Sequence, residues 1–176
     1  MLKSLFSGEA NEGEAAGYSY GLIKCCTWDE QAVAHLISVS DGSLHDRIAR
    51  SSMMGLALVG LRQKSKVGSV FEDLYRKNDY VLRMGAASLL GMAYVGTGDE
   101  QSVSVLLKMC ASDLSSDVRR AATFSIGLIL IKEKQRAFEL MKMLKSSYNE
   151  FVRHAVALTL GVLFAGTYNK EVTSVL

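Results

Sequence analysis

Hydrophobic residues recur along the chain with the period of an amphipathic helix. Spacing of the i, i+3, i+4, i+7 type gives a helix one buried face. The sets are Ala32, Val33, Leu36 and Ile37; Val67, Val70, Phe71 and Leu74; and Val103, Leu106, Leu107 and Cys110. The pattern therefore predicts three amphipathic helices.

Segments of a second kind alternate with these helices and are apolar nearly all round. The run Ala122–Ile131 is an example, and such a helix needs neighbours on both sides. Candidate N-cap residues precede these segments, namely Ser43, Asp79, Ser115 and Asn149. About sixteen residues later, Gly96–Gly98 and Gly166–Thr167 suit a helix C-terminus. Each apolar segment with the amphipathic helix that follows it is predicted to form a helical hairpin.

A glycine recurs at the same position of each apolar segment. Residues 83–97 and 153–167 align without a gap, and weaker copies at 13–21, 47–55 and 119–127 share that glycine. The anchor positions are Gly21, Gly55, Gly91, Gly127 and Gly161, separated by 34, 36, 36 and 34 residues. Because glycine inside a helix costs about 1 kcal/mol relative to alanine, we expect these residues to allow close packing of successive first helices. The period predicts an all-α solenoid of about five helical hairpins.

Arginine also recurs at a fixed distance before the anchor glycine. Eight residues before it, four of the five copies carry Arg47, Arg83, Arg119 or Arg153. These side chains could bind the carboxylates of a partner, but a fixed position in the first turn of each first helix favours a bridge to the adjacent repeat. Positions Gly21, Gly55, Gly91, Gly127 and Gly161 and the four arginines are thus expected to be structural, and the partner-binding residues stay unknown.

Composition narrows the class of protein. The chain is 49% hydrophobic and 22% charged, which predicts one domain over residues 1–176, and the absence of proline excludes a proline-rich linker. A net charge of +2 argues against nucleic acid, and the apolar runs are too short to cross a membrane. Three cysteines without metal-type spacing, together with the lack of a leader at Met1, predict a reduced, intracellular protein.

Candidate chemistry is sparse. His35, His45 and His154 lie in unrelated contexts, so no catalytic, cofactor-binding or metal-binding residue is expected. Gly96 and Gly98 follow a helix and lack the third glycine of a dinucleotide loop, which favours a hairpin turn. A helical-repeat metalloenzyme is the less favoured alternative.

The recurring columns resemble the proteasome/cyclosome (PC) repeat: an Arg-x-small-small helix, then Leu-Gly with small and aromatic residues, then a Gly-Thr-Gly turn. Residues 83–99 look like a full copy, and the resemblance covers about residues 9–176. The family has two subunits in the base of the 26S proteasome regulatory particle, of which the larger is the more similar, and a relative in the anaphase-promoting complex. The resemblance implies a scaffold in cytoplasm and nucleus that organises ATPase subunits, lid subunits and ubiquitin receptors. The smaller proteasome subunit and the cyclosome relative remain alternatives.

The departures from this pattern predict further features. Family members carry more repeats, which close into a ring, so the chain is expected to be a fragment. Gly13 in place of arginine and Lys132–Glu133 in place of Gly-Thr predict a bent or shortened first and fourth repeat. Met1–Phe6 resemble the remainder of a preceding hairpin, and Leu176 falls inside a second helix. Exposed apolar end faces are therefore expected to cause self-association.

Overall fold

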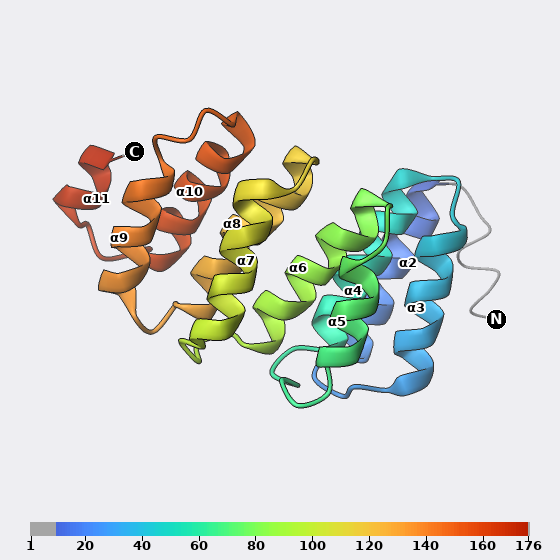
Figure 1. Cartoon of the computed structure of the whole chain (residues 1–176). Helices are drawn as coiled ribbons and strands as arrows, with labels where there is room; N and C mark the ends of the chain where they lie inside the picture. The colour runs from blue at the N-terminus through green and yellow to red at the C-terminus, as the bar shows by residue number, and fades with distance from the viewer. Residues whose placement is uncertain (1–9, 176) are drawn as a thin grey trace. The chain divides into compact units, whose positions relative to one another are not determined.

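The computed structural model describes residues 10–175, and within them it contains ten helices and no strand (Figure 1). The chain divides into two compact units, of which the first ends at Ala93 and the second begins at Tyr94. The first unit holds α2 (Ala10–Ile23), α3 (Glu30–Gly42), α4 (Asp46–Val59), α5 (Gly68–Tyr75) and α6 (Tyr80–Ala93). The second unit holds α7 (Glu100–Ser112), α8 (Ser116–Ile129), α9 (Lys134–Leu144), α10 (Glu150–Leu163) and α11 (Lys170–Val175).

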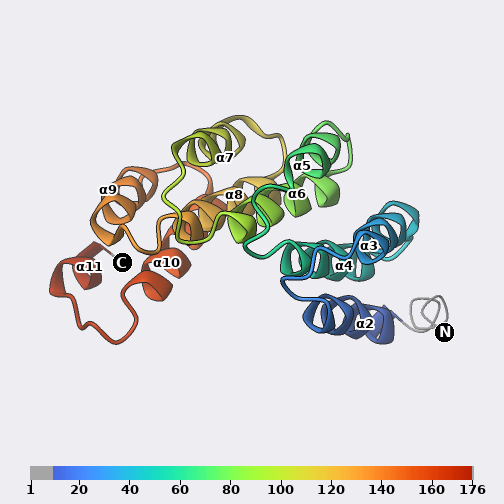
Figure 2. The same cartoon turned by 90° about the horizontal axis from the view of Figure 1, so that it is seen from below.

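Each unit is a stack of helical hairpins, which confirms the expected all-α solenoid fold. In the first unit α2 packs on α4 and α4 packs on α6, while α3 lies on α4 and α5 on α6 (Figure 2). In the second unit α8 packs on α10, with α7 on α8 and α9 on α10. The single domain expected for residues 1–176 stays a prediction, and Met1–Phe6 lie outside the described residues.

The pairing of the helices differs from the expectation by one helix. We expected each apolar first helix to form a hairpin with the amphipathic helix after it, yet α3 packs mainly on α4, α5 on α6, α7 on α8 and α9 on α10. The turn after a first helix explains this. Its backbone N–H groups bind the next first helix, as Cys26 does with the carbonyl of Leu58 (3.2 Å) and Gly96 with that of Leu128 (3.0 Å). These bonds satisfy carbonyls at a helix C-terminus and carry the chain across to the neighbour.

The five first helices have the same length, since α2, α4, α6, α8 and α10 each span 14 residues. The predicted caps act at two of them. The carboxylate of Asp79 accepts from the N–H of Val81 at 2.7 Å, and the Asn149 side chain accepts from two N–H groups at the start of α10. Ser115 is the N-cap residue of α8 without a side-chain bond, and Ser43 stands two residues before the N-cap His45 of α4.

The fourth repeat is shortened as expected, since α9 has 11 residues against 13 in α3 and α7. The first repeat is not shortened, and the shortest of these helices is α5 in the second repeat, with 8 residues. In the turn before α5, Arg62 has a φ of 60° and donates its N–H to the carbonyl of Met92. The residues after Arg62 stay outside the helix until Gly68, which leaves the second-helix layer incomplete beside α3.

Candidate functional site

Three of the anchor glycines, Gly21, Gly55 and Gly127, lie where first helices touch. A Cβ atom built on Gly21 in α2 would come within 2.8 Å of the carbonyl oxygen of Gly55 in α4, and one on Gly55 would lie 2.5 Å from the carbonyl oxygen of Gly17. In the second unit a Cβ on Gly127 would collide with Thr159 of α10. A side chain at these positions would thus have to separate the helices. By contrast, Gly161 has no atom within 4 Å of its built Cβ.

The register of the second copy differs from the sequence alignment by two residues. Gly21, Gly91, Gly127 and Gly161 each lie two residues before the end of their helix, whereas Gly55 lies four residues before Val59. The position equivalent to the anchor glycine in α4 is Ala57. Gly55 consequently faces the preceding helix α2, while Gly21 and Gly127 face the helix that follows each of them.

The two-residue offset of α4 also places Arg47 differently from the other three arginines. Arg83, Arg119 and Arg153 are the fourth residues of their helices, and each donates to carbonyls of the loop before its helix. Arg83 reaches two of these carbonyls, at 3.0 and 2.7 Å. Arg47 is the second residue of α4 and donates to the side chain of Asn11 in α2 at 2.9 Å. Three arginines therefore bind the loops before their helices. Arg119 also donates to the hydroxyl of Tyr148 in the next repeat, and Arg47 connects two first helices.

An arginine–tyrosine–aspartate cluster connects α4 to α6, and the sequence analysis did not find it. The Tyr80 hydroxyl donates to the carboxylate of Asp46 at 2.7 Å, and Arg50 donates to both residues. The Tyr80 hydroxyl and the Arg50 guanidinium hold the pKa of Asp46 below its ordinary value, while the bond to Asp46 raises the pKa of Tyr80. One signal in the sequence could have revealed this cluster. It is a tyrosine at the start of a helix, thirty-four residues after an aspartate.

The three histidines lie apart from one another in the structure. His35, His45 and His154 lie on different helices or loops, and no group of three histidine, cysteine, aspartate or glutamate side chains that could hold a metal ion occurs among the described residues. Burial raises the pKa of the Cys110 thiol. Within residues 10–175, no helix is long and apolar enough to cross a membrane.

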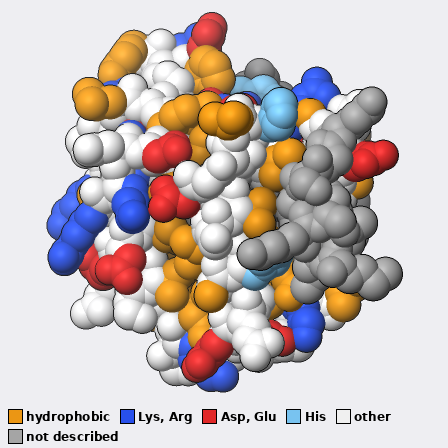
Figure 3. All heavy atoms as spheres, turned by 90° about the vertical axis from the view of Figure 1, so that its right-hand side faces the viewer, with side chains coloured by type: hydrophobic (Ala, Val, Ile, Leu, Met, Phe, Trp, Pro, Cys, Tyr) orange, Lys and Arg blue, Asp and Glu red, His pale blue; other side chains and the backbone are white. Residues whose placement is uncertain are grey.

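Hydrophobic side chains are exposed on two first helices. On α2 the exposed fractions are 62% for Leu22 and 75% for Ile23, and on α10 they are 50% for Leu158 and 43% for Val162. Figure 3 faces the side where α2 and α3 lie in Figure 1 and shows hydrophobic side chains gathered in a stripe through a polar surface. These faces are the surfaces a further first helix would cover in a stack of this kind.

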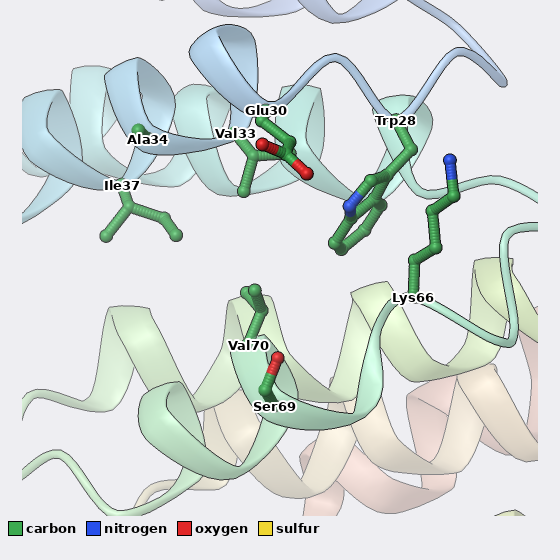
Figure 4. Close-up of a pocket in the computed structure, with 8 residues that line it drawn as sticks. All are labelled: Trp28, Glu30, Val33, Ala34, Ile37, Lys66, Ser69 and Val70. Atoms are coloured by element: carbon green, nitrogen blue, oxygen red, sulfur yellow. The ribbon is translucent and has the colours of Figure 1, made fainter.

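A groove of about 560 Å³ separates α3 from α5 (Figure 4). One wall is the face of α3 that carries Glu30, Val33, Ala34 and Ile37, and the other carries Ser69 and Val70 of α5. Trp28 and Lys66 lie at the same end of the groove, where the loop before α5 replaces helix. We call this the α3–α5 groove.

The polar groups of the α3–α5 groove have no hydrogen-bonding or ionic partner among the residues that the structure describes. Glu30 and Lys66 are exposed, and neither forms an ion pair or side-chain hydrogen bond with another described residue. Trp28 is 8% exposed, and its indole N–H, which solvent reaches, donates to no acceptor among residues 10–175. Figure 4 shows the indole nitrogen on the side of the ring that faces the groove.

The stacked first helices and their small-residue contacts define a helical-repeat protein. No family model matches the chain. It is 32% identical over 173 residues to the 26S proteasome non-ATPase regulatory subunit 1 of Drosophila melanogaster, and 33% identical over 172 residues to homolog A of that subunit in Arabidopsis thaliana. It is also 31% identical over 163 residues to the 26S proteasome regulatory subunit rpn2 of Schizosaccharomyces pombe.

These alignments cover 98%, 98% and 93% of this chain, respectively, and 17% of each relative. The chain thus spans about a sixth of the length of the curated relatives it matches. The chain is thus homologous to a part of the 26S proteasome non-ATPase regulatory subunit 1, which matches the resemblance of its sequence to the PC repeat.

Proposed function

We propose that this chain is a non-catalytic scaffold segment of the 26S proteasome regulatory particle. In this role it organises ATPase subunits, lid subunits and ubiquitin receptors for ubiquitin-dependent protein degradation, in cytoplasm and nucleus. The observation that carries the proposal is the similarity along 98% of the chain to proteins named as non-ATPase regulatory subunits of that particle. The stack of hairpins supports it, because repeat stacks offer long surfaces on which other proteins assemble.

Two alternatives from the same family are less favoured. A scaffold of the anaphase-promoting complex and the smaller proteasome PC subunit would each share the repeat, but the relatives found at 29–34% identity carry the names subunit 1 or RPN2. A helical-repeat metalloenzyme is tested by metal analysis of the purified protein. Stoichiometric iron or zinc would overturn the scaffold assignment.

Affinity capture from the source cells tests the proposal. The tagged chain is expected to recover proteasomal ATPase and lid subunits at a fixed ratio. Gly17→Leu is expected to lose them, because a side chain there meets the backbone of α4 at Ser51 and Ser52. The matched control Gly42→Leu has no atom within 4 Å of its built Cβ and should keep them. Recovery of cyclosome subunits without proteasomal ATPases would contradict the proposal.

We further propose that the exposed faces of α2 and α10 cause self-association of the isolated chain. Leu158 and Val162 lie one turn apart on a face of α10 that no other described side chain covers near Gly161. Sedimentation should show a mass that rises with concentration, and the double variant Leu158→Lys, Val162→Lys should lower it. A wild-type chain that remains monomeric at high concentration would exclude this association.

A further inference from the structure

We propose that Cys25 and Cys26 form a dithiol site, which binds one trivalent arsenic centre of the monosubstituted type, R–As(OH)2, through both sulfur atoms. Two As–S bonds form and two As–O bonds break. The thiol protons leave with the two hydroxyl groups as water, and arsenic stays trivalent, so the reaction needs no oxidant or reductant. The distance between the thiols, their exposure and the turn that fixes them carry the proposal, which does not depend on the complex that the chain joins.

The two thiols are neighbours in space as well as in sequence. Their Sγ atoms lie 3.6 Å apart, in an exposed contact. Cys26 is exposed and Cys25 is half-buried, so a small reagent can reach both. The third cysteine differs on each count, because Cys110 is buried and its Sγ contacts the hydroxyl of Thr123. The three cysteines of the chain are therefore one accessible thiol pair and one enclosed thiol.

The turn after α2 holds both cysteines in place. The N–H of Cys26 donates to the carbonyl of Leu58 in α4 at 3.2 Å. The φ of Cys26 is 62°, close to the 67° of Gly96 and the 72° of Gly166 at the equivalent positions of the third and fifth repeats. Because the same turn recurs in other repeats, its conformation does not depend on the thiols. The pair is thus already in place before a ligand binds, which lowers the entropy cost of binding.

The separation of the sulfur atoms favours a bent bridging atom over a disulfide bond. A disulfide needs an S–S distance of about 2.05 Å and Cα atoms about 4.4–6.8 Å apart, whereas consecutive Cα atoms are about 3.8 Å apart. A linear two-coordinate ion with bonds of about 2.3 Å needs sulfur atoms about 4.6 Å apart. Two bonds of that length span 3.6 Å at an angle of about 100°. Trivalent arsenic fits, because its lone pair makes it pyramidal, with bond angles somewhat below the tetrahedral value.

The number of bonds and the protonation state distinguish arsenic from a divalent metal ion. A monosubstituted arsenical has two hydroxyl groups to exchange, and two thiols replace both. A tetrahedral zinc ion takes four ligands, of which this pair supplies two. Burial and the contact with Cys26 raise the pKa of the Cys25 thiol, which keeps that thiol protonated at neutral pH. Metal binding must expel this proton, whereas in the arsenical reaction it leaves as part of a water molecule.

Phenylarsine oxide, which forms such a dihydroxide in water, is the probe. Intact-mass spectrometry should show one phenylarsenic group per chain. The adduct should survive excess mercaptoethanol and be released by ethanedithiol, because only a second dithiol competes with two bonds made at one site. The emission of Trp28, the only tryptophan and two residues from Cys26, should change saturably at the same stoichiometry. The affinity should stay constant over the pH range in which both thiols are protonated.

Single-thiol variants and a matched control locate the site. Cys25→Ser and Cys26→Ser each leave one bond, so they should weaken binding at least about a hundredfold and lose the adduct to mercaptoethanol. Cys110→Ser removes the third thiol and should bind the probe as the wild-type chain does. Circular dichroism establishes that the three variants are folded. The proposal fails if mercaptoethanol strips the wild-type adduct, or if Cys26→Ser keeps it. Either result leaves the capture of proteasomal subunits, and thus the proposed function, separately testable.

Discussion

Replacing Gly21 with alanine tests whether the in-phase glycines exist for close helix packing. The new methyl group would collide with the Cα atom of Gly55 and would lie 2.8 Å from its carbonyl oxygen and 2.9 Å from its carbonyl carbon, where ordinary contacts begin at 3.4 Å. Backbone atoms cannot rotate away as a side chain can, so α2 must move from α4 by about half an ångström or more. Overpacking of this kind costs about 1–3 kcal/mol.

Alanine also favours the helix itself by about 1 kcal/mol over glycine, which opposes the packing cost. Gly161→Ala provides the matched control, because Gly161 lies at the same position of its helix and has no atom within 4 Å of its built Cβ. We expect Gly161→Ala to stabilise the fold by about 1 kcal/mol. Gly21→Ala should leave it about 0–2 kcal/mol less stable. The difference of about 1–3 kcal/mol isolates the packing cost, since the helix propensity cancels.

Urea unfolding followed by circular dichroism gives the two free energies. Amide hydrogen exchange then locates the effect, because α2 can open locally without global unfolding. Protection in α2 should fall in Gly21→Ala and stay unchanged in Gly161→Ala. If both variants stabilise the protein equally, the glycines do not serve close packing and the reasoning fails.

Two further predictions follow from the repeat contacts. Tyr80→Phe should raise the pKa of Asp46 toward its ordinary value, as measured by a carboxyl NMR titration. Because folding lowers that pKa, the ionised carboxylate stabilises the fold at neutral pH, and this contribution is lost as the pH falls through the lowered value. The variant should therefore lose less stability in acid, and an unchanged Asp46 titration would exclude the link. Arg83→Ala removes two hydrogen bonds to loop carbonyls and should cost about 1 kcal/mol, whereas Arg47→Ala removes one exposed contact and should cost less than about 0.5 kcal/mol. Thermal unfolding compares them, and equal losses would contradict the assigned contacts.

Local signals predicted much of the fold. The helical period, the Asp79 and Asn149 caps and the small residues on the first helices are properties of short segments, and the structure has helices at each. The register of the second copy could not be found this way. Gly55 and Ala57 are both small, so either can be aligned with the anchor glycine, and only the contact of Gly55 with α2 distinguishes them.

The sequence could not predict the α3–α5 groove either. Trp28 and Val70 are forty-two residues apart, and the hydrophobic set that begins at Val67 predicts α5 without indicating a groove between α5 and α3. The one available signal was that Trp28 takes the turn position that Gly98 holds in the third repeat. Without the backbone conformation, tryptophan in place of glycine at this position cannot be told apart from ordinary sequence variation in a loop.

By itself, the sequence determined that this protein is a stack of helices with close contacts between its first helices, because periodicity and capping act within one or two turns of chain. Tertiary structure decided which helices pair, since backbone N–H groups of the turn after one first helix bind carbonyls of the next. It also decided where the outer layer opens beside Trp28. Both depend on contacts between residues more than thirty positions apart, and such contacts leave no mark on local hydrophobic spacing.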